Sequence, residues 1–298
     1  MRTLILSIIV VSVMACNTRT QIKENPEKND AESEQLSNQN IDSTAYFLEE
    51  SLELNQEKTK SIKVERLITT EDDKNKLQEL VIAKKFFKEE DFYILDYQYP
   101  YLNEEVDSNY MMFNDFLTEN YLNIKATENE ILEDKVIFCD SLGIGRCMDK
   151  RVIDYKVYAI KSNLISVLLY KENYYSGMKH STYMFECLNF DLDHHKFIYY
   201  NDFFIENSEK ELLTVINSTI SNGIKSGELF YECWELSVED FKMYKNNFVV
   251  NDDTIEFYFD DCIICPSYTG TYSIEIPITE IMHLIKKYNN KPLIGVNL

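Results

Sequence analysis

The pattern of apolar and polar positions divides the chain into three parts. Residues 4–13 (LILSIIVVSV) form an apolar run that only two serines interrupt. Residues 17–45 have few large apolar side chains and no aromatic ones, and they are rich in Asn, Glu, Gln, Ser and Lys. Such a composition cannot bury enough apolar surface to fold, so we expect a disordered tether here. Structure is predicted to begin near Tyr46.

Beyond Tyr46, strand-like and helix-like patterns are interspersed. Alternation of apolar and polar positions predicts strands over residues 61–70, 91–100, 152–160, 164–170, 183–192, 197–200, 248–250, 254–259 and 271–276. Helical spacing predicts helices over residues 46–54, 74–87, 109–122, 207–221 and 238–244, and one that begins after Pro277.

Two further features complete the predicted architecture. Ser208 and Glu211 have the spacing of a capping box at the start of the helix over 207–221. Residues 123–151 show neither pattern and are expected to be irregular. Because strands and helices do not alternate regularly, the pattern predicts an α+β fold. We expect mixed or antiparallel sheets with a few packed helices, in two intimately joined subdomains.

The first residues predict export and a lipid anchor. Arg2 precedes the apolar run, and that run is shorter than the roughly 20 residues that a membrane-spanning helix needs. It therefore suits a signal peptide. The sequence Val13-Met14-Ala15-Cys16 resembles the lipobox of bacterial lipoproteins, in which the cysteine thiol receives diacylglycerol. We expect cleavage after residue 15, lipid on Cys16 and a location in the cell envelope; the alternative is an ordinary signal peptide with an incidental cysteine.

Charge narrows the choice of partners. The chain has 30 Lys and Arg against 51 Asp and Glu, and the signal peptide contains only Arg2. The mature chain therefore has 29 basic side chains against 51 acidic ones, a net charge of −22. Such a surface repels nucleic acid and anionic lipid head groups, and it attracts basic proteins or cations. The alternative interpretation is that the charge serves only solubility.

Seven cysteines are present, and lipid is expected on one of them. The even remainder in an exported chain indicates disulfides, and six cysteines allow fifteen pairings. Cys139 and Cys147 bracket a glycine-containing reversal and form the preferred pair. Cys262 and Cys265 form a CxxC, which needs a local turn or other partners because an extended strand would hold the two apart. Cys187 and Cys233 then remain to pair by elimination.

The sequence contains no readable active site. The Asp191–His195 stretch has the wrong alternation for metal ligands on one strand face, so a solvated turn is the better interpretation. His180 is expected to be buried and hydrogen-bonded, and His283 to lie on the surface. No known nucleophile, metalloprotease or phosphate-binding motif occurs. We therefore assign no catalytic, cofactor-binding or metal-binding residue.

Three segments resemble a known family. In residues 97–122, YQYPYLN leads into a predicted helix, which resembles the N-terminal domain shared by the peptidoglycan deacetylase PdaC and the lysozyme-sensing anti-sigma factor RsiV. YYSGMKHSTYMFECLNFDL, followed by HHKFIYYNDFF and a helix, is similar to the C-terminal domain of the same group, as is the end of the chain, FVVNDDTIEFYF and CIICPSYTGTYSIEIPITEI. The residues that match the family's central pattern are Gly177, His180, Asn189, Phe190, Asp191, Asp202 and Phe203.

The resemblance covers roughly residues 61–284 and implies a domain division. Residues 46–172 would form the N-terminal α+β domain with a cysteine-bearing insertion, and residues 173–298 the C-terminal α+β domain. The chain departs from the family at Ser176–His180, where Gly-Gly-Ala-His is usual, and in its CxxC and central insertion. Neither the deacetylase activity nor the anti-sigma role is expected, because no catalytic domain and no spanning helix accompany these domains.

We therefore expect a lipid-anchored binding or sensing module of the cell envelope. Its partner would be a basic protein, such as a lysozyme-like muramidase, or peptidoglycan. Nucleic acid is not expected, and the membrane is reached only through the N-terminal lipid. The alternatives are a hydrolase that acts on peptidoglycan or glycan, and a structural envelope lipoprotein. The predicted ligand loops contain Tyr175, Gly177, His180, Tyr268 and Tyr272.

Overall fold

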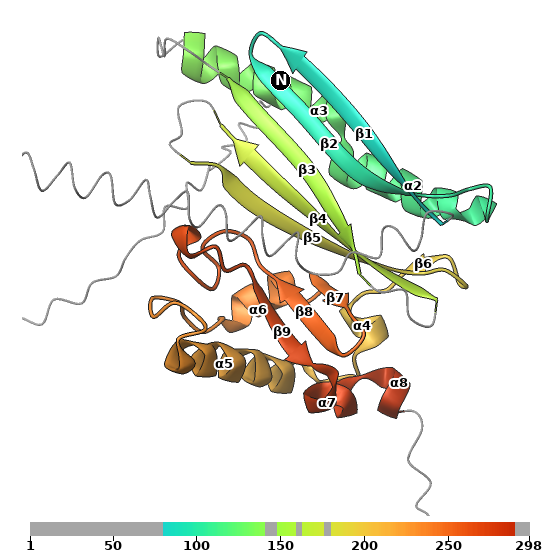
Figure 1. Ribbon diagram of the computed structural model, residues 1–298, viewed down its shortest axis with the longest axis vertical. Coiled ribbons are helices and arrows are strands. Elements are labelled where there is room, and N and C mark those ends of the chain that lie inside the picture. Colours follow the sequence, from blue (N-terminus) through green and yellow to red (C-terminus); the bar gives the residue numbers. More distant parts are fainter. Residues whose placement is uncertain (1–79, 141–147, 159–162, 176–179, 290–298) are drawn as a thin grey trace, which may run out of the picture. The chain divides into compact units, whose positions relative to one another are not determined.

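The computed structural model describes residues 80–140, 148–158, 163–175 and 180–289 (Figure 1). Within these residues, six strands form one sheet in the order β1-β2-β3-β4-β5-β6, and three form a second in the order β7-β8-β9. Several helices accompany both sheets, which confirms the α+β class. The predicted signal peptide, Cys16, the tether and the elements predicted over 46–54 and 61–70 lie outside the described residues.

The six-stranded sheet is mixed. Its neighbouring strands are antiparallel except β2 and β3, which run parallel. A parallel pair needs a long crossover, and here the crossover carries two helices, α2 (Met111–Leu117) and α3 (Ile124–Asp134), which lie along one side of the sheet (Figure 1). The strands are β1 (Val81–Glu90), β2 (Tyr93–Leu102), β3 (Asp149–Val157), β4 (Leu164–Tyr174), β5 (Thr182–Asp191) and β6 (Lys196–Phe197).

The crossover helices and the sheet enclose the first core. Alternate strand residues point to this side, as the pleat requires, and they meet the apolar side of α2. Turns of 3-10 helix (Ser108–Tyr110) and π helix (Thr118–Leu122 and Lys135–Asp140) flank the two α-helices. Fully buried members of this core include Leu95, Phe113, Leu117, Ile165, Leu169 and Phe190.

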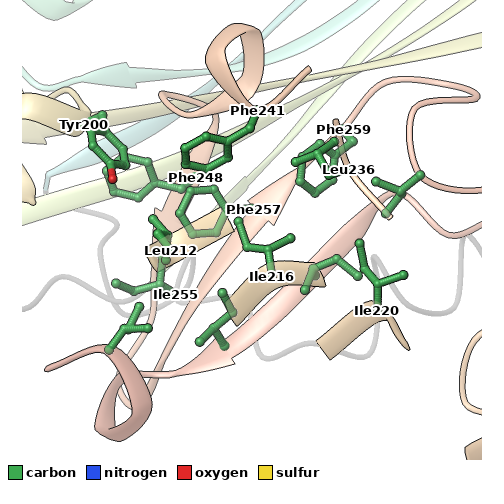
Figure 2. Close-up of a cluster of buried hydrophobic side chains, with 14 of the residues drawn as sticks. Tyr200, Leu212, Ile216, Ile220, Leu236, Phe241, Phe248, Ile255, Phe257 and Phe259 are labelled. Atoms are coloured by element: carbon green, nitrogen blue, oxygen red, sulfur yellow. The ribbon is translucent and has the colours of Figure 1, made fainter. Parts of the chain in front are cut away.

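The second sheet and its helices make up the C-terminal body, residues 198–289. α5 buries Leu212, Ile216 and Ile220, which recur at four-residue spacing, beside the phenylalanines of β7 and β8 (Figure 2). The helix ends at Gly227, whose φ of 80° is the left-handed conformation that glycine adopts most readily. The elements are α4 (Tyr200–Phe203), α5 (Glu209–Ser226), α6 (Val238–Tyr244), β7 (Phe248–Val250), β8 (Thr254–Tyr258), a 3-10 turn (Ser267–Thr269), β9 (Ser273–Pro277), α7 (Ile278–Ile281), a 3-10 turn (Met282–Leu284) and α8 (Lys286–Asn289).

A third cluster, with buried amides beside it, joins the C-terminal body to the six-stranded sheet. The Asn247 side chain accepts from the Cys187 amide at 2.7 Å and donates to the carbonyl oxygens of Phe185 (2.8 Å) and Tyr258 (3.0 Å). Asn189 donates to the Phe248 carbonyl at 2.7 Å. The six-stranded sheet also continues through the domain boundary expected between residues 172 and 173, which falls inside β4.

Three of the sequence predictions are wrong. The strand expected over residues 197–200 contributes only Phe197 to β6, and Tyr200 begins helix α4. Residues 74–87 were expected to be helical, but Val81–Glu90 is strand β1, which pairs with β2 along its whole length. Its β-branched and aromatic side chains favour a strand, and pairing with a neighbour outweighs local helix propensity. Residues 123–151 were expected to be irregular but contain α3, a π-helical turn and the start of β3. Only Ile131 of α3 is buried, so its apolar periodicity is weak.

The predicted capping box is also absent. Ser208 has helical backbone angles and no capping hydrogen bond. Its hydroxyl donates instead to the Ile205 carbonyl oxygen at 2.7 Å and lies 2.8 Å from the Tyr200 hydroxyl. Ser208 is buried, so this hydroxyl pair satisfies two polar groups inside the core.

Candidate functional site

The predicted ligand residues do not form one site. Tyr272 is buried and packs against Phe185, with ring centroids 4.8 Å apart. Tyr175 lies elsewhere: the Arg151 guanidinium sits 4.0 Å from its ring centroid. Arg151 is buried and shares its side of β3 with Ile153 and Tyr155, which belong to the core beneath α2 and α3. Tyr175 and Tyr272 therefore lie on opposite faces of the six-stranded sheet.

The remaining residues of the predicted ligand loops are exposed or lie outside the description. His180 was expected to be buried, but it is exposed; it precedes β5 at the edge of the described chain, where no apolar layer covers it. Gly177 lies outside the described residues. Tyr268 is 48% exposed. Tyr174, at the start of the first predicted loop, is 36% exposed, so the ring of Tyr268 in the second loop is the more exposed of the two.

Tyr268 belongs to a group of exposed rings. Phe230 is 39% exposed, Tyr231 73% and Trp234 39%. The ring centroids of Phe230 and Tyr231 are 4.5 Å apart, and those of Phe230 and Tyr268 are 5.6 Å apart. We call Phe230, Tyr231, Trp234 and Tyr268 the aromatic patch. Exposed aromatic groups of this kind are typical of interaction surfaces.

A disulfide holds together the two segments that form the aromatic patch. Cys233 is bonded to Cys265, with their Cα atoms 4.1 Å apart. Beside it, the Trp234 amide donates to the Ile264 carbonyl oxygen at 2.9 Å, and the Trp234 indole donates to the Ile263 carbonyl oxygen at 2.8 Å. The disulfide and these two hydrogen bonds therefore fix the backbone that carries the rings.

This disulfide corrects the predicted pairing. Cys187 was predicted to pair with Cys233, but it is a free buried thiol. It lies on β5 in the third cluster, between the six-stranded sheet and the C-terminal body. Burial raises its pKa well above the usual range. Cys262 is disulfide-bonded too. Because Cys265 bonds to Cys233, the partner of Cys262 is another cysteine, which was one of the two possibilities left open for the CxxC. The predicted pair of Cys139 and Cys147 lies outside the part of the chain whose side chains are described.

The surroundings of the aromatic patch are acidic. Residues 226–241 contain five carboxylates and no lysine or arginine. Glu228, Glu232 and Glu235 are exposed between or beside the rings in sequence. Such side chains attract cations and repel phosphates. The segment thus combines exposed rings with five carboxylates, and the nearest lysines in sequence, Lys225 and Lys242, lie directly outside it.

Two half-buried carboxylates lie at β5. Burial raises the pKa of Glu186, and Lys171 opposes that rise. Glu186 shares its side of β5 with Leu188 and Phe190, so it faces the first core. Burial likewise raises the pKa of Asp260, whose carboxylate accepts from the Phe185 amide at 2.9 Å and from the Tyr244 hydroxyl at 3.0 Å. Asp260 therefore links the C-terminal body to β5.

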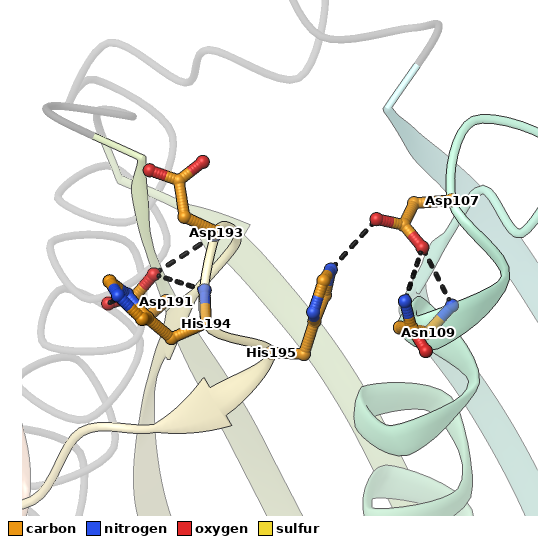
Figure 3. Close-up of polar contacts among 6 residues, drawn as sticks. All are labelled: Asp107, Asn109, Asp191, Asp193, His194 and His195. Atoms are coloured by element: carbon orange, nitrogen blue, oxygen red, sulfur yellow. Dashed lines mark hydrogen bonds and ion pairs between the residues drawn. The ribbon is translucent and has the colours of Figure 1, made fainter.

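The histidines make local polar contacts (Figure 3). His194 Nδ1 lies 2.9 Å from Asp191, within the turn between β5 and β6. His195 Nε2 lies 2.8 Å from Asp107, which caps the turn before α2. His283 Nε2 lies 2.8 Å from Glu211. Over residues 80–289, apart from the gaps in the description, no three His, Cys, Asp or Glu side chains gather as a metal site would require.

A hollow of about 450 Å³ lies along α5. Small polar side chains dominate its lining, with Thr214, Ser218, Asn222 and Glu280 among them. It contains no histidine or cysteine, and we assign no chemistry to it. Among the described helices, none combines the length and the apolar character needed to cross a bilayer.

The aromatic patch was only partly visible in the sequence. Tyr268 was predicted, but Phe230, Tyr231 and Trp234 were not. The available indication was LFYECWEL, an apolar cluster that fits neither helical nor strand spacing and is interrupted by carboxylates. Outside a helix or strand, such a cluster has no single apolar side that can pack against the core. Exposure of some of its rings could therefore have been predicted.

Comparison with known proteins supports the fold. The chain is similar to the crystal structure of a member of the DUF3298 family from Bacteroides fragilis, with a TM-score of 0.52 and 16% sequence identity over 69% of this chain and 92% of that one. A DUF3298 family protein from Pseudomonas aeruginosa gives a TM-score of 0.49 and 12% identity over 70% of this chain and 94% of that one. No protein-family model and no curated protein matches the sequence. At 16% identity, the likeness to the Bacteroides fragilis structure shows a shared fold and nothing more.

Proposed function

We propose that this chain is a lipid-anchored module of the cell envelope that binds a basic protein, with a lysozyme-like muramidase as the first candidate. Cys16 would carry the lipid. The choice of lysozyme rests on the resemblance of the sequence to the extracellular region of the lysozyme sensor RsiV. The solved structures that share the fold belong to a family named only as a domain of unknown function, so they support the fold of this proposal and not its ligand.

The acidic segment with exposed rings is the observation that carries the proposal. Charge alone gives weak attachment, because salt screens exposed charges beyond about 8 Å at physiological ionic strength. Specific complexes need a packed centre as well, and aromatic residues are enriched in such centres. Residues 226–241 supply both features, since Tyr231 and Trp234 are exposed among five carboxylates.

Titration with two basic proteins tests the ligand. The mature chain, in detergent micelles, would be titrated with lysozyme and with cytochrome c at low and at physiological salt. We expect lysozyme binding to saturate at one per chain and to survive physiological salt, whereas cytochrome c binding should disappear. If the two basic proteins behave alike, the charge serves only solubility and the proposal is wrong.

A separate experiment tests the anchor. Cys16→Ser should abolish labelling by radioactive palmitate and leave the precursor uncleaved, because the thiol is the atom that would receive the lipid. Cys187→Ser is the matched control, since it removes a thiol without touching the predicted lipobox. Equal labelling of wild type and Cys16→Ser would contradict the anchor while leaving the binding proposal standing.

A further inference from the structure

We propose that the aromatic patch is a docking platform for arginine side chains of the partner. This inference rests on the proposed function in one respect, the basic character of that partner. It adds the surface, the four rings that form it, and the chemical group that they recognise. The occupant is a guanidinium group that stacks on Tyr231, Trp234 or Tyr268 while neighbouring carboxylates neutralise it.

The first argument is that the rings are held before any partner arrives. The Cys233–Cys265 bond links residues 32 apart in the sequence, and Trp234 is fixed at both its amide and its indole nitrogen. A surface fixed in this way loses little conformational entropy on binding. Tyrosine and tryptophan also present large flat faces with few rotatable bonds, which suits them to the centre of an interface.

The second argument comes from the protein's other aromatic rings. Several of them already carry a cation of the chain itself: Lys84 lies 3.2 Å from the ring centroid of Tyr101, Lys156 4.2 Å from that of Tyr158 and Arg151 4.0 Å from that of Tyr175. In the described part of the chain, no such contact falls on a ring of the aromatic patch. The aromatic patch therefore offers rings beside carboxylates without a cation of its own chain, and a partner could supply that cation.

The third argument selects arginine over lysine. A guanidinium is planar and weakly hydrated, so it stacks on aromatic faces and can donate two parallel hydrogen bonds to one carboxylate. An ammonium is a compact, strongly hydrated charge that gains less from a flat ring. Glu232 is exposed, next to Tyr231 and two residues before Trp234, and it supplies such a carboxylate.

Trp234 makes the experiment direct, because it is the only tryptophan in the chain. The mature chain would be titrated with hexa-arginine and with hexa-lysine, neither of which fluoresces, while Trp234 emission is recorded. We expect hexa-arginine to change the emission at concentrations at which hexa-lysine, of equal charge, does not. Equal responses to the two peptides would overturn the arginine assignment, because charge alone would then explain binding.

Variants locate the surface. Tyr231→Ala and Tyr268→Ala should each weaken hexa-arginine binding about two- to five-fold, the effect that one exposed cation–ring contact supplies. Phe87→Ala is the matched control: Phe87 is 55% exposed, but it lies on β1 with Lys85 already 5.8 Å from its ring centroid. If the patch variants bind like wild type, or if Phe87→Ala weakens binding as much, the platform is not the aromatic patch.

The outcome with lysozyme separates this inference from the proposed function. Patch variants that retain wild-type affinity for lysozyme, in a chain that still distinguishes lysozyme from cytochrome c, would overturn the platform and leave the function intact. Hexa-arginine binding that the patch variants weaken, in a chain without preference for lysozyme, would leave the platform and remove the proposed ligand.

Discussion

The two parts of the molecule use the same kinds of side chain differently. In the six-stranded sheet and its helices, most rings are buried in the core or lie beside lysine or arginine of the chain, as Tyr101 lies beside Lys84. In the C-terminal body, the four rings of the aromatic patch are exposed in a segment rich in carboxylates. Buried rings in the first part stabilise the fold, whereas the rings of the aromatic patch bury little surface within the chain. This difference is the reason for proposing that a partner binds to the C-terminal body.

The largest expected effect is the difference in free energy of unfolding between removing a buried ring and removing an exposed ring of the aromatic patch. Phe257→Ala should lower the free energy of unfolding by about 3–5 kcal/mol, because Phe257 is fully buried and its removal leaves a cavity. Tyr231→Ala should change it by less than about 0.5 kcal/mol, as expected of an exposed side chain. Urea denaturation followed by circular dichroism measures both. A loss of more than 2 kcal/mol in Tyr231→Ala would show that the ring is part of the fold.

Removing the disulfide should have the next largest effect. The double variant Cys233→Ser/Cys265→Ser should lose about 2–4 kcal/mol, because the bond closes a long loop that the unfolded chain would otherwise leave open. Trp234 lies beside the bond, so its emission should shift before the circular dichroism of the six-stranded sheet changes. Simultaneous loss of both signals would show that the two parts unfold as one, and the comparison between them would then concern surfaces only.

The smallest expected effect concerns Glu186, a half-buried carboxylate on the side of β5 that faces the first core. Burial raises the pKa of Glu186 above its ordinary value near 4.5, with Asp260 adding to the rise and Lys171 opposing it. A raised pKa in the folded state means that Glu186 stabilises the fold fully below its unfolded pKa and loses that contribution as the pH rises through its folded pKa. Glu186→Gln should therefore be more stable than wild type at pH 7 and should depend less on pH above 4.5.

Denaturation in urea at pH 5 and pH 7 would show this difference. The control is Glu239→Gln, which removes an exposed carboxylate from the C-terminal body. An equal change in both variants would mean that overall charge, and not the partial burial of Glu186, sets the pH dependence.

The sequence predicted most strands correctly where alternation was strong. The strands predicted over 152–160 and 164–170 correspond to β3 and β4, and the helix over 238–244 has the bounds of α6. It failed for β1, whose lysines resemble those of a helix surface and whose strand conformation depends on pairing with β2. It also failed for α3, because one buried isoleucine gives no period to detect.

The candidate site was less accessible from sequence for a physical reason. Phe230 and Tyr268 meet across two segments that the Cys233–Cys265 bond joins, and six cysteines do not specify their pairing. Tyr272 was expected beside Tyr268 in a ligand loop, but Tyr268 lies in the 3-10 turn Ser267–Thr269 and is exposed, whereas Tyr272 directly precedes β9 and is buried. Exposure is decided by the fold around a loop and not by the composition of that loop.

A footprint of the bound partner tests the central claim most directly. Amide hydrogen exchange of the mature chain would be compared with and without saturating lysozyme. Binding through the aromatic patch predicts slower exchange in residues 228–237 and 262–270, and unchanged exchange in β1 and α3. Slower exchange confined to β1–β3 or their helices would contradict the assignment of binding to the C-terminal body.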